Sequence, residues 1–231
     1  MKTLFLTGAN RGIGLAIVAE ALNRDYHVFA GCRQPETATK LQSLHTSHPQ
    51  RLTLIPIDVT DDASIQAAAT AVAEQVQAVD VLINNAGVFP RGERIGNLDA
   101  RTMLHAFHVN SVGPMMVVQQ FLPLLRASRE TKILNITSKL GSITQPTGSY
   151  YSYNSSKAAL NMLTRILASE LRPAGILAVV VHPGWVQTDM GGSAAPLRPH
   201  QSARGILNLA ESLTLDDAGE FFTWDGRKHP W

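Results

Sequence analysis

A tyrosine and a lysine stand four residues apart, at Tyr153 and Lys157, and this spacing places two side chains on one face of a helix. A free phenol has a pKa near ~10, so it exchanges protons slowly at neutral pH. A nearby ammonium group favours the phenolate and lowers that pKa, so the pair could pass a proton to or from a substrate oxygen. Tyr150 and Tyr151 are expected at or before the start of this helix, away from that face.

Two hydroxyl side chains, Thr137 and Ser138, end an apolar run that predicts a strand. A hydroxyl at the carboxyl end of a strand can hydrogen-bond a substrate carbonyl and orient it. Because side chains alternate along a strand, only one of these two residues is expected to face the site.

A glycine-rich segment runs from Thr7 to Gly14, with the sequence Thr-Gly-Ala-Asn-Arg-Gly-Ile-Gly, between a short apolar run and a helical pattern. Glycine permits a tight turn and a close approach of the backbone to a phosphate. The start of the following helix offers free N–H groups and a positive dipole end to a pyrophosphate. The absence of a Lys-Ser/Thr pair after the last glycine excludes a P-loop.

These residues need elements to hold them, and the chain alternates between apolar runs and helical patterns. The predicted strands are Leu4–Leu6, Tyr26–Ala30, Leu52–Ile57, Val79–Ile83, Lys132–Thr137 and Ile176–Val181, with a possible edge strand at Glu220–Trp224. The predicted helices are Gly12–Asn23, Glu36–Leu44, Ser64–Val76, Asn97–Ala127, Ser152–Leu171 and Gln201–Leu213, and Pro114 must kink or divide the fourth.

Near-continuous apolar strands separated by helices predict parallel strands that are covered on both faces. No linker composition and no fixed-period repeat marks a second unit in the 231 residues. We therefore expect one doubly wound α/β domain over residues 1–231, with a parallel sheet of about seven strands. Its ligand should lie at the carboxyl ends of the strands, near the switch point.

Composition narrows the class of protein. Hydrophobic residues make up 45% and charged residues 16%, which excludes global disorder. A net charge of +2 gives no argument for nucleic acid or an anionic membrane as the main partner. The single cysteine, Cys32, excludes a disulfide scaffold, and His105 and His108 lack further ligands for a metal. No signal peptide or membrane-spanning run is recognised, so we expect a cytoplasmic protein.

Four motifs in this order resemble the short-chain dehydrogenase/reductase family. They are Thr-Gly-x-x-x-Gly-x-Gly, Asn84-Asn85-Ala86-Gly87, the Tyr153–Lys157 pair, and Pro183-Gly184 followed by Thr188. The resemblance covers essentially the whole chain. It implies a Rossmann fold, a nicotinamide dinucleotide and hydride transfer between that cofactor and a carbonyl or alcohol.

The resemblance also implies a role for each catalytic residue. Tyr153 would be the general acid/base, and Lys157 would serve both this tyrosine and the nicotinamide ribose. Ser138 would be the substrate hydroxyl, which leaves Thr137 on the packing side. Asn110 would hold a water that links the lysine to solvent.

The implied cofactor site is larger. Asp58 would meet the adenine amino group; the alternative is that it caps the next helix, a role for which Asp61 and Asp62 compete. Thr188 would bond the nicotinamide amide. The full set expected to bind cofactor is Gly8, Asn10, Arg11, Gly12, Ile13, Gly14, Arg33, Asp58, Val59, Asn84, Asn85, Ala86, Gly87, Tyr153, Lys157, Pro183, Gly184, Val186 and Thr188.

A finer resemblance rests on His182–Gly192 and on the ending Asp225-Gly226 with Trp231, which are similar to the C-factor and Sniffer-type carbonyl reductases. Members of that group are described as carbonyl reductases or as developmental signalling factors. The segment after Thr188 is short, which suggests an open, permissive substrate site. Trp185 could be a core residue or a wall of the substrate pocket.

The second strand predicts the choice of cofactor. NAD enzymes place an acid at the end of this strand, where it binds the ribose 2′-hydroxyl. Here the strand ends in Cys32-Arg33, and Glu36 follows Pro35 and is expected to start the next helix. Arg33, with Arg11 from the glycine loop, could bind a 2′-phosphate, so we expect NADP(H) to be preferred over NAD(H).

A further expectation concerns assembly. Family members pair their long helices, so Asn97–Ala127 and Ser152–Leu171 are the candidate interface of a homodimer or homotetramer.

The alternative to an enzyme is a nucleotide-sensing or signalling protein of the same fold without turnover.

Overall fold

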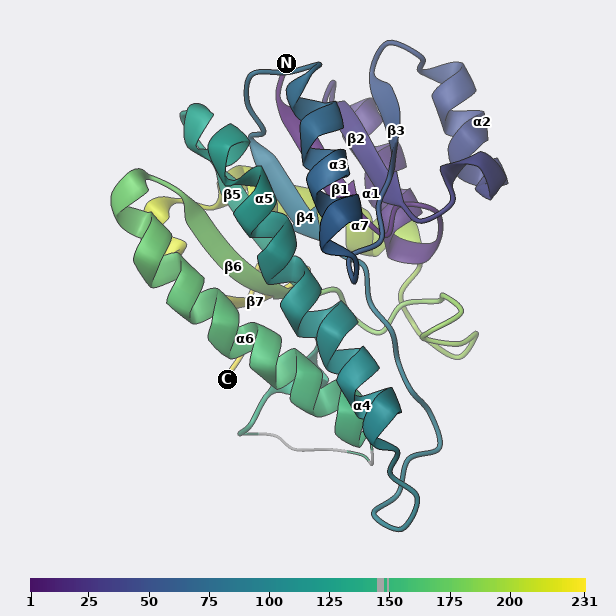
Figure 1. Cartoon of the computed structure of the whole chain (residues 1–231). Coiled ribbons are helices and arrows are strands. Elements are labelled where there is room, and N and C mark those ends of the chain that lie inside the picture. Colours follow the sequence, from purple (N-terminus) through teal and green to yellow (C-terminus); the bar gives the residue numbers. More distant parts are fainter. Residues whose placement is uncertain (145–147, 149) are drawn as a thin grey trace.

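Seven parallel strands form one sheet in the order β3-β2-β1-β4-β5-β6-β7 (Figure 1). The computed structural model describes residues 1–144, 148 and 150–231. The strands are β1 (Thr3–Thr7), β2 (His27–Cys32), β3 (Leu52–Pro56), β4 (Val81–Asn84), β5 (Lys132–Ile136), β6 (Leu177–His182) and β7 (Phe221–Thr223). The predicted doubly wound α/β class is confirmed, and the chain forms a single domain of this kind.

The helices cover the sheet in two layers, each packed on its own apolar core (Figure 1). One layer contains α1 (Gly12–Asn23), α2 (Thr39–Ser47) and α7 (Pro199–Ser212). The other contains α3 (Asp62–Ala73), α4 (Ala100–Phe107), α5 (Gly113–Ala127) and α6 (Tyr151–Leu171). Because both faces are covered, strands β1, β2 and β6 are almost entirely buried, as their apolar sequences predicted, whereas the edge strand β3 is only partly buried.

The helical region over Asn97–Ala127, which Pro114 was expected to kink or divide, is two helices joined by a π-helical turn at His108–Val112. Pro114 lies in the first turn of α5, where its missing N–H costs nothing. The division therefore precedes the proline. It buries Val109, Asn110 and Ser111 in the widened turn.

The segment expected as a helix over Glu36–Leu44 also divides. A 3₁₀ turn at Pro35–Thr37 comes first, and α2 begins after Ala38, whose φ of −81° and ψ of 71° are not helical. The predicted edge strand is present as β7, and the other elements lie within a few residues of their predicted bounds.

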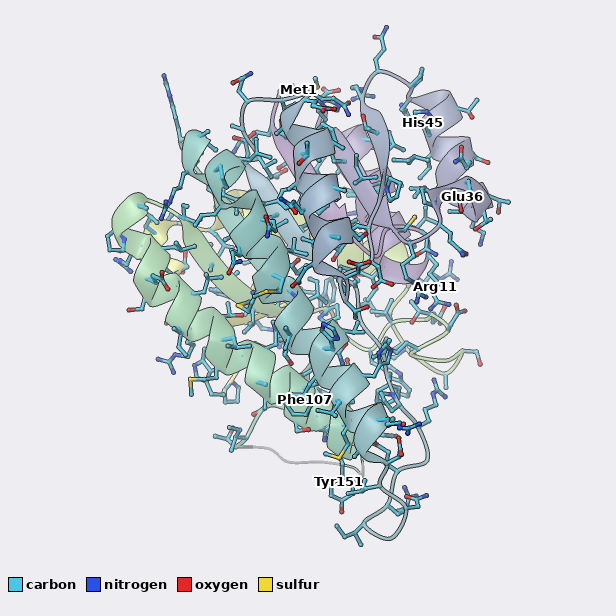
Figure 2. All side chains as sticks on the ribbon, viewed as in Figure 1. Met1, Arg11, Glu36, His45, Phe107 and Tyr151 are labelled. Carbon is cyan, nitrogen blue, oxygen red and sulfur yellow. The ribbon has the colours of Figure 1, made fainter. Side chains whose placement is uncertain are left out.

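The switch point of the sheet lies between β1 and β4, because the chain leaves this pair of strands in opposite directions. A crevice at the carboxyl ends of these strands is where such sheets bind ligands. In Figure 2, Tyr151 at the start of α6 lies at the opposite end of the molecule from Met1. Among the described helices, none is long and apolar enough to cross a membrane.

The core beneath the crevice gives a stability prediction. Phe121 on α5 is fully buried, and its ring centroid lies 4.2 Å from that of Phe5 on β1. We expect Phe121→Ala to lower the free energy of unfolding by roughly 3–5 kcal/mol, through lost burial and a residual cavity. Urea denaturation measures this. Ile95→Ala, at a side chain that is 79% exposed, is the control and should leave the unfolding free energy nearly unchanged. Equal effects of the two changes would contradict the packing described here.

Candidate active site

Tyr153 and Lys157 lie together in the first two turns of α6, at exposed fractions of 8% and 4%. The Lys157 Nζ is 5.9 Å from the centroid of the Tyr153 ring. It donates a 2.7 Å hydrogen bond to the Ile136 carbonyl oxygen at the end of β5. Tyr150 is the N-cap residue and Tyr151 the first helical residue, so the helical register expected from the spacing is confirmed.

Burial dominates the proton affinities of this pair. It raises the pKa of Tyr153 to about 12, against a hydrogen bond with Ser138 that acts in the lowering direction. It lowers the pKa of Lys157 to about 7, because the ammonium form is poorly solvated. The tyrosine pKa therefore lies above its usual value in the ligand-free protein, whereas the spacing alone had suggested a lowered one.

The strand end separates the two hydroxyl residues. Ser138 is buried beside Tyr153, and its Oγ also accepts a 3.1 Å hydrogen bond from the Leu140 N–H. The Thr137 hydroxyl instead donates a 2.6 Å hydrogen bond to Asn161 Oδ1 on α6. Ser138 thus faces the tyrosine and Thr137 faces the packing side, as expected.

Asn110 lies fully buried in the π-helical turn. Its Oδ1 accepts from the Val88 N–H at 2.9 Å, and its Nδ2 donates to the Val88 carbonyl and to Ser156 Oγ, both at 3.0 Å. The side chain therefore joins the loop after β4 to α6. These contacts use both Nδ2 hydrogens and one of the two lone pairs of Oδ1, which leaves little of the side chain free for the expected water.

The glycine loop has the geometry of a phosphate cradle. Gly8 and Gly12 have φ values of +69° and +56°, which favour glycine. A Cβ on Gly14 would lie 2.1 Å from the Gly8 carbonyl oxygen, so the loop closes directly onto the start of α1. Arg11 at the N-cap provides no side-chain cap, and the first turn of α1 has no acid. Within α1 itself, therefore, no side chain competes for the N–H groups of the first turn.

The motif after β4 divides into two parts. The Asn85 Nδ2 donates to the carbonyls of Thr7 and Gly8 at 3.0 and 3.1 Å, which ties this segment to the glycine loop. The Ala86 N–H adds a 3.1 Å bond to Thr7 Oγ1. Asn84 instead lies inside the sheet, where its Nδ2 donates to Asn135 Oδ1 at 2.9 Å. Asn84 is thus beneath the crevice rather than on its surface.

The final residue of that motif, Gly87, lies next to the lysine. A Cβ at this position would be 3.2 Å from Asn110 Oδ1 and 3.8 Å from Lys157 Nζ. A residue without a side chain keeps the approach to the Lys157 ammonium open.

Asp58 and Arg33 lie at neighbouring strand ends. Asp61, not Asp58, caps α3 by accepting from the Ala63 and Ser64 N–H groups. Burial acts to raise the pKa of Asp58, but hydrogen bonds from Thr60 and the charge of Arg33 outweigh it, so this pKa is below its usual value. Arg33 is exposed directly after β2, and Val59 is buried.

The segment after β6 contacts the glycine loop. A Cβ on Gly12 would lie 3.2 Å from the Thr188 methyl carbon. The Arg11 guanidinium forms a 3.1 Å ion pair with Asp189, although both side chains are largely exposed. This exposed surface pair does not test the expectation that Arg11 binds a 2′-phosphate, because exposed ion pairs separate at little cost.

The residues that begin this segment have separate surroundings. Gly184 has a φ of +88°, and a Cβ there would lie 2.7 Å from a Leu197 methyl carbon. Pro183 and Val186 are buried. Trp185 is 52% exposed, and its Nε1 donates to the Gly191 carbonyl at 2.8 Å, so it is not a core residue.

The sequence motifs did not identify Phe89, which forms one wall of the site beside Tyr153. The Phe89 ring meets the Tyr153 ring edge-on, with centroids 4.6 Å apart, and also packs on Tyr150. Beside it lies a cavity of about 320 Å³ lined by Phe89, Arg91, Gly92, Arg94, Gly148 and Tyr150. The loop that carries Phe89 has no hydrophobic periodicity from which this contact could be predicted.

Within the described ranges, no group of three His, Cys, Asp or Glu residues could hold a metal ion.

Comparison with known proteins agrees with this geometry. The sequence model described as short chain dehydrogenase matches residues 2–198. The chain belongs to the short chain dehydrogenase family, which confirms the resemblance seen in its motifs.

Its relatives extend over most of its length. C-signal from Myxococcus xanthus is 44% identical over 154 residues, which cover 66% of this chain and 93% of that protein. The NADPH-bound carbonyl reductase from chicken fatty liver is 38% identical with a TM-score of 0.95, and covers 100% of this chain and 99% of that one. Carbonyl reductase Sniffer of D. melanogaster is 34% identical with a TM-score of 0.95, over 100% of both chains.

The buried lysine gives a pH prediction. Because burial lowers the pKa of Lys157 from 10.5 to about 7, the unfolded chain binds more protons than the folded chain between these values. Stability of the ligand-free wild type should therefore rise across that window, by at most about 1.4 kcal/mol per pH unit. Lys157→Met, a near-isosteric neutral change, should remove this dependence. Urea unfolding at pH 6, 8 and 10 measures the difference between the two proteins. An identical pH slope for both would contradict the burial effect.

Proposed function

We propose that the protein is an NADP(H)-dependent carbonyl reductase that transfers hydride between the cofactor and a carbonyl or alcohol substrate. The observation that carries this proposal is the cluster of Tyr153, Lys157 and Ser138 at one end of α6, beside an open cavity. Two structural relatives that align over the whole chain are named carbonyl reductases, and one of them was solved with NADPH.

The crevice at the switch point fits a dinucleotide. Its glycine loop leaves no room for side chains, and the start of α1 has neither a cap nor an acid to compete with a pyrophosphate. When bound, the cofactor supplies the hydride. We assign Gly8, Gly12 and Gly14 to the pyrophosphate, Asp58 and Val59 to the adenine side, and Thr188 to the nicotinamide side.

Tyr153 is the proposed proton donor for carbonyl reduction. Its raised pKa keeps it protonated near neutral pH, and this is the form that can donate to a developing alkoxide. Ser138, whose hydroxyl lies beside that phenol and acts to lower its pKa, is proposed to hold the substrate oxygen within reach of it.

Lys157 is the proposed link between the two halves of the site. Its Nζ has one partner in the Ile136 carbonyl and lies near the Tyr153 ring, so its remaining donors can reach ribose hydroxyls. We assign the water-binding role expected of Asn110 to the main chain of the π-helical turn. That water would carry protons between Lys157 and solvent.

The cavity beside Tyr153 is the proposed substrate site. Phe89 and Tyr150 provide apolar walls, and Phe89 touches the tyrosine that would donate the proton. Trp185, which is exposed near the end of β6, is assigned to the outer wall. An open site of this kind suits more than one carbonyl compound.

Assembly is proposed through α4 and α6. Exposed apolar side chains occur on both helices, at Leu104, Met162 and Ile166. Burial of such residues against a second copy would give the homodimer or homotetramer that the family resemblance implies.

The first test of this function removes the hydroxyl group of Tyr153. We expect Tyr153→Phe to lower kcat by ~10²–10⁴-fold, because the proton donor is lost, while NADPH binding survives. NADPH oxidation with an activated dicarbonyl, together with NADPH titration, measures both. Tyr151→Phe is the matched control and should retain activity. A wild type that binds NADPH but never turns over would instead favour the nucleotide-sensing alternative.

A second test concerns the choice of cofactor, for which Arg33 replaces the acid of NAD enzymes. Losing a charge-assisted contact to the 2′-phosphate costs ~1.5–3 kcal/mol, so Arg33→Ala should lower the preference for NADPH over NADH by ~10–100-fold. The measurement is kcat/KM with each cofactor. Arg11→Ala should have a smaller effect, because that guanidinium is paired with Asp189. A wild type that prefers NADH would refute the assignment.

A further inference from the structure

The amino end of α6 has no cap of its own. Tyr150 stands at the N-cap position without a side-chain cap, and the first turn contains no acid. The first four N–H groups of any helix lack partners within that helix. The helix that carries Tyr153 and Lys157 therefore needs an acceptor from elsewhere in the chain.

Glu93, in the loop after β4, provides that acceptor. One carboxylate oxygen accepts a 2.9 Å hydrogen bond from the Ser152 N–H, and the other accepts a short hydrogen bond from Ser152 Oγ. Glu93 is only 6% exposed and Ser152 is fully buried. Since 59 positions separate the two residues, this is a tertiary cap rather than a local one.

The charge of Glu93 is balanced by the helix. In the described part of the chain its carboxylate forms no ion pair, and the neighbouring Arg94 guanidinium contacts the Glu93 main-chain carbonyl at 2.7 Å. A buried carboxylate is costly unless hydrogen bonds and local dipoles compensate it. The two bonds from Ser152 and the positive end of the 21-residue helix α6 do so.

The contact between Glu93 and Ser152 lies directly beside the proposed proton donor, Tyr153. Ser152 directly precedes Tyr153, and the loop of Glu93 also carries Phe89, which packs on the Tyr153 ring. Glu93 thus joins the wall of the cavity to the helix that presents the phenol.

We propose that Glu93 is a positioning residue, which holds the start of α6 against the loop after β4 so that the Tyr153 hydroxyl stays directed at Ser138. The inference rests on the proposed reductase function. A displacement of a reacting group by about 1 Å can cost about 10²-fold in rate, so a loosened helix start should appear in kcat.

The experiment compares Glu93→Ala with Glu93→Gln, because the glutamine oxygen can still accept from the Ser152 N–H while its amide donates to Ser152 Oγ. We expect kcat for NADPH-dependent dicarbonyl reduction to fall roughly 10- to 100-fold in Glu93→Ala and to return close to wild type in Glu93→Gln. The Kd of NADPH, measured by fluorescence titration, should stay at the wild-type value in both, since the glycine loop is untouched. Glu74→Ala, at an exposed glutamate at the end of α3, is the matched control.

Several outcomes would overturn the proposal. A Glu93→Ala protein with full kcat and a lowered free energy of unfolding would make Glu93 a stabilising cap alone. Equal losses of kcat in the Ala and Gln variants would mean that the charge, not the hydrogen bonds, is required. If Glu93→Ala does not fold, Ser152→Ala tests the same link, since it removes one of the two bonds and should lower kcat by a smaller factor. An inactive wild type would refute the proposed function itself, and this result is distinct because every variant and control would share it.

Discussion

The polar side chains on the buried face of α6 constrain the rest of the site. Polar groups removed from water need partners, and an unmatched one costs about as much as several matched ones contribute. Along α6, Asn161 accepts from Thr137 and donates to the Gly141 carbonyl, and Thr164 accepts from Asn135. Each bond fixes the helix against the end of β5 or the loop that follows it. These bonds therefore hold the helix in register with the end of β5.

The π-helical turn and the loop after β5 provide further partners for the buried face of α6. The π-helical turn directs Asn110 and Ser111 at Ser156, and Ser111 Oγ donates to the Ser156 carbonyl at 2.6 Å. A regular helix through this region would turn these side chains elsewhere, because a π turn inserts an extra residue. The close approach of Gly141 to the Lys157 backbone, 2.9 Å from a hypothetical Cβ, serves the same packing. The placement of Tyr153 and Lys157 follows from satisfying this buried face.

Much of this arrangement could be predicted from the sequence. Apolar runs gave the strands, and the spacing of Tyr153 and Lys157 gave their shared helix face, because both signals are local and periodic. Phe89 and Glu93 could not be found in this way, since their partners Tyr153 and Ser152 lie about 60 positions away and the loop has no period. The raised pKa of Tyr153 was also missed, because it depends on burial, which spacing does not reveal. The ion pair of Arg11 with Asp189 was missed as well, because 178 positions separate the two residues.

The pairing of β1 with β4 has a consequence for how the chain folds. The Thr3 N–H bonds an Asp80 carboxylate oxygen across 77 positions, so this part of the sheet closes a long loop of chain. Such non-local contacts form slowly, because loop closure must precede them. A nascent chain with only its first three strands complete therefore lacks the crevice, since one wall is still unsynthesised. Nucleotide added during refolding should bind the finished molecule alone and draw the population toward it, as any ligand specific for the native state does.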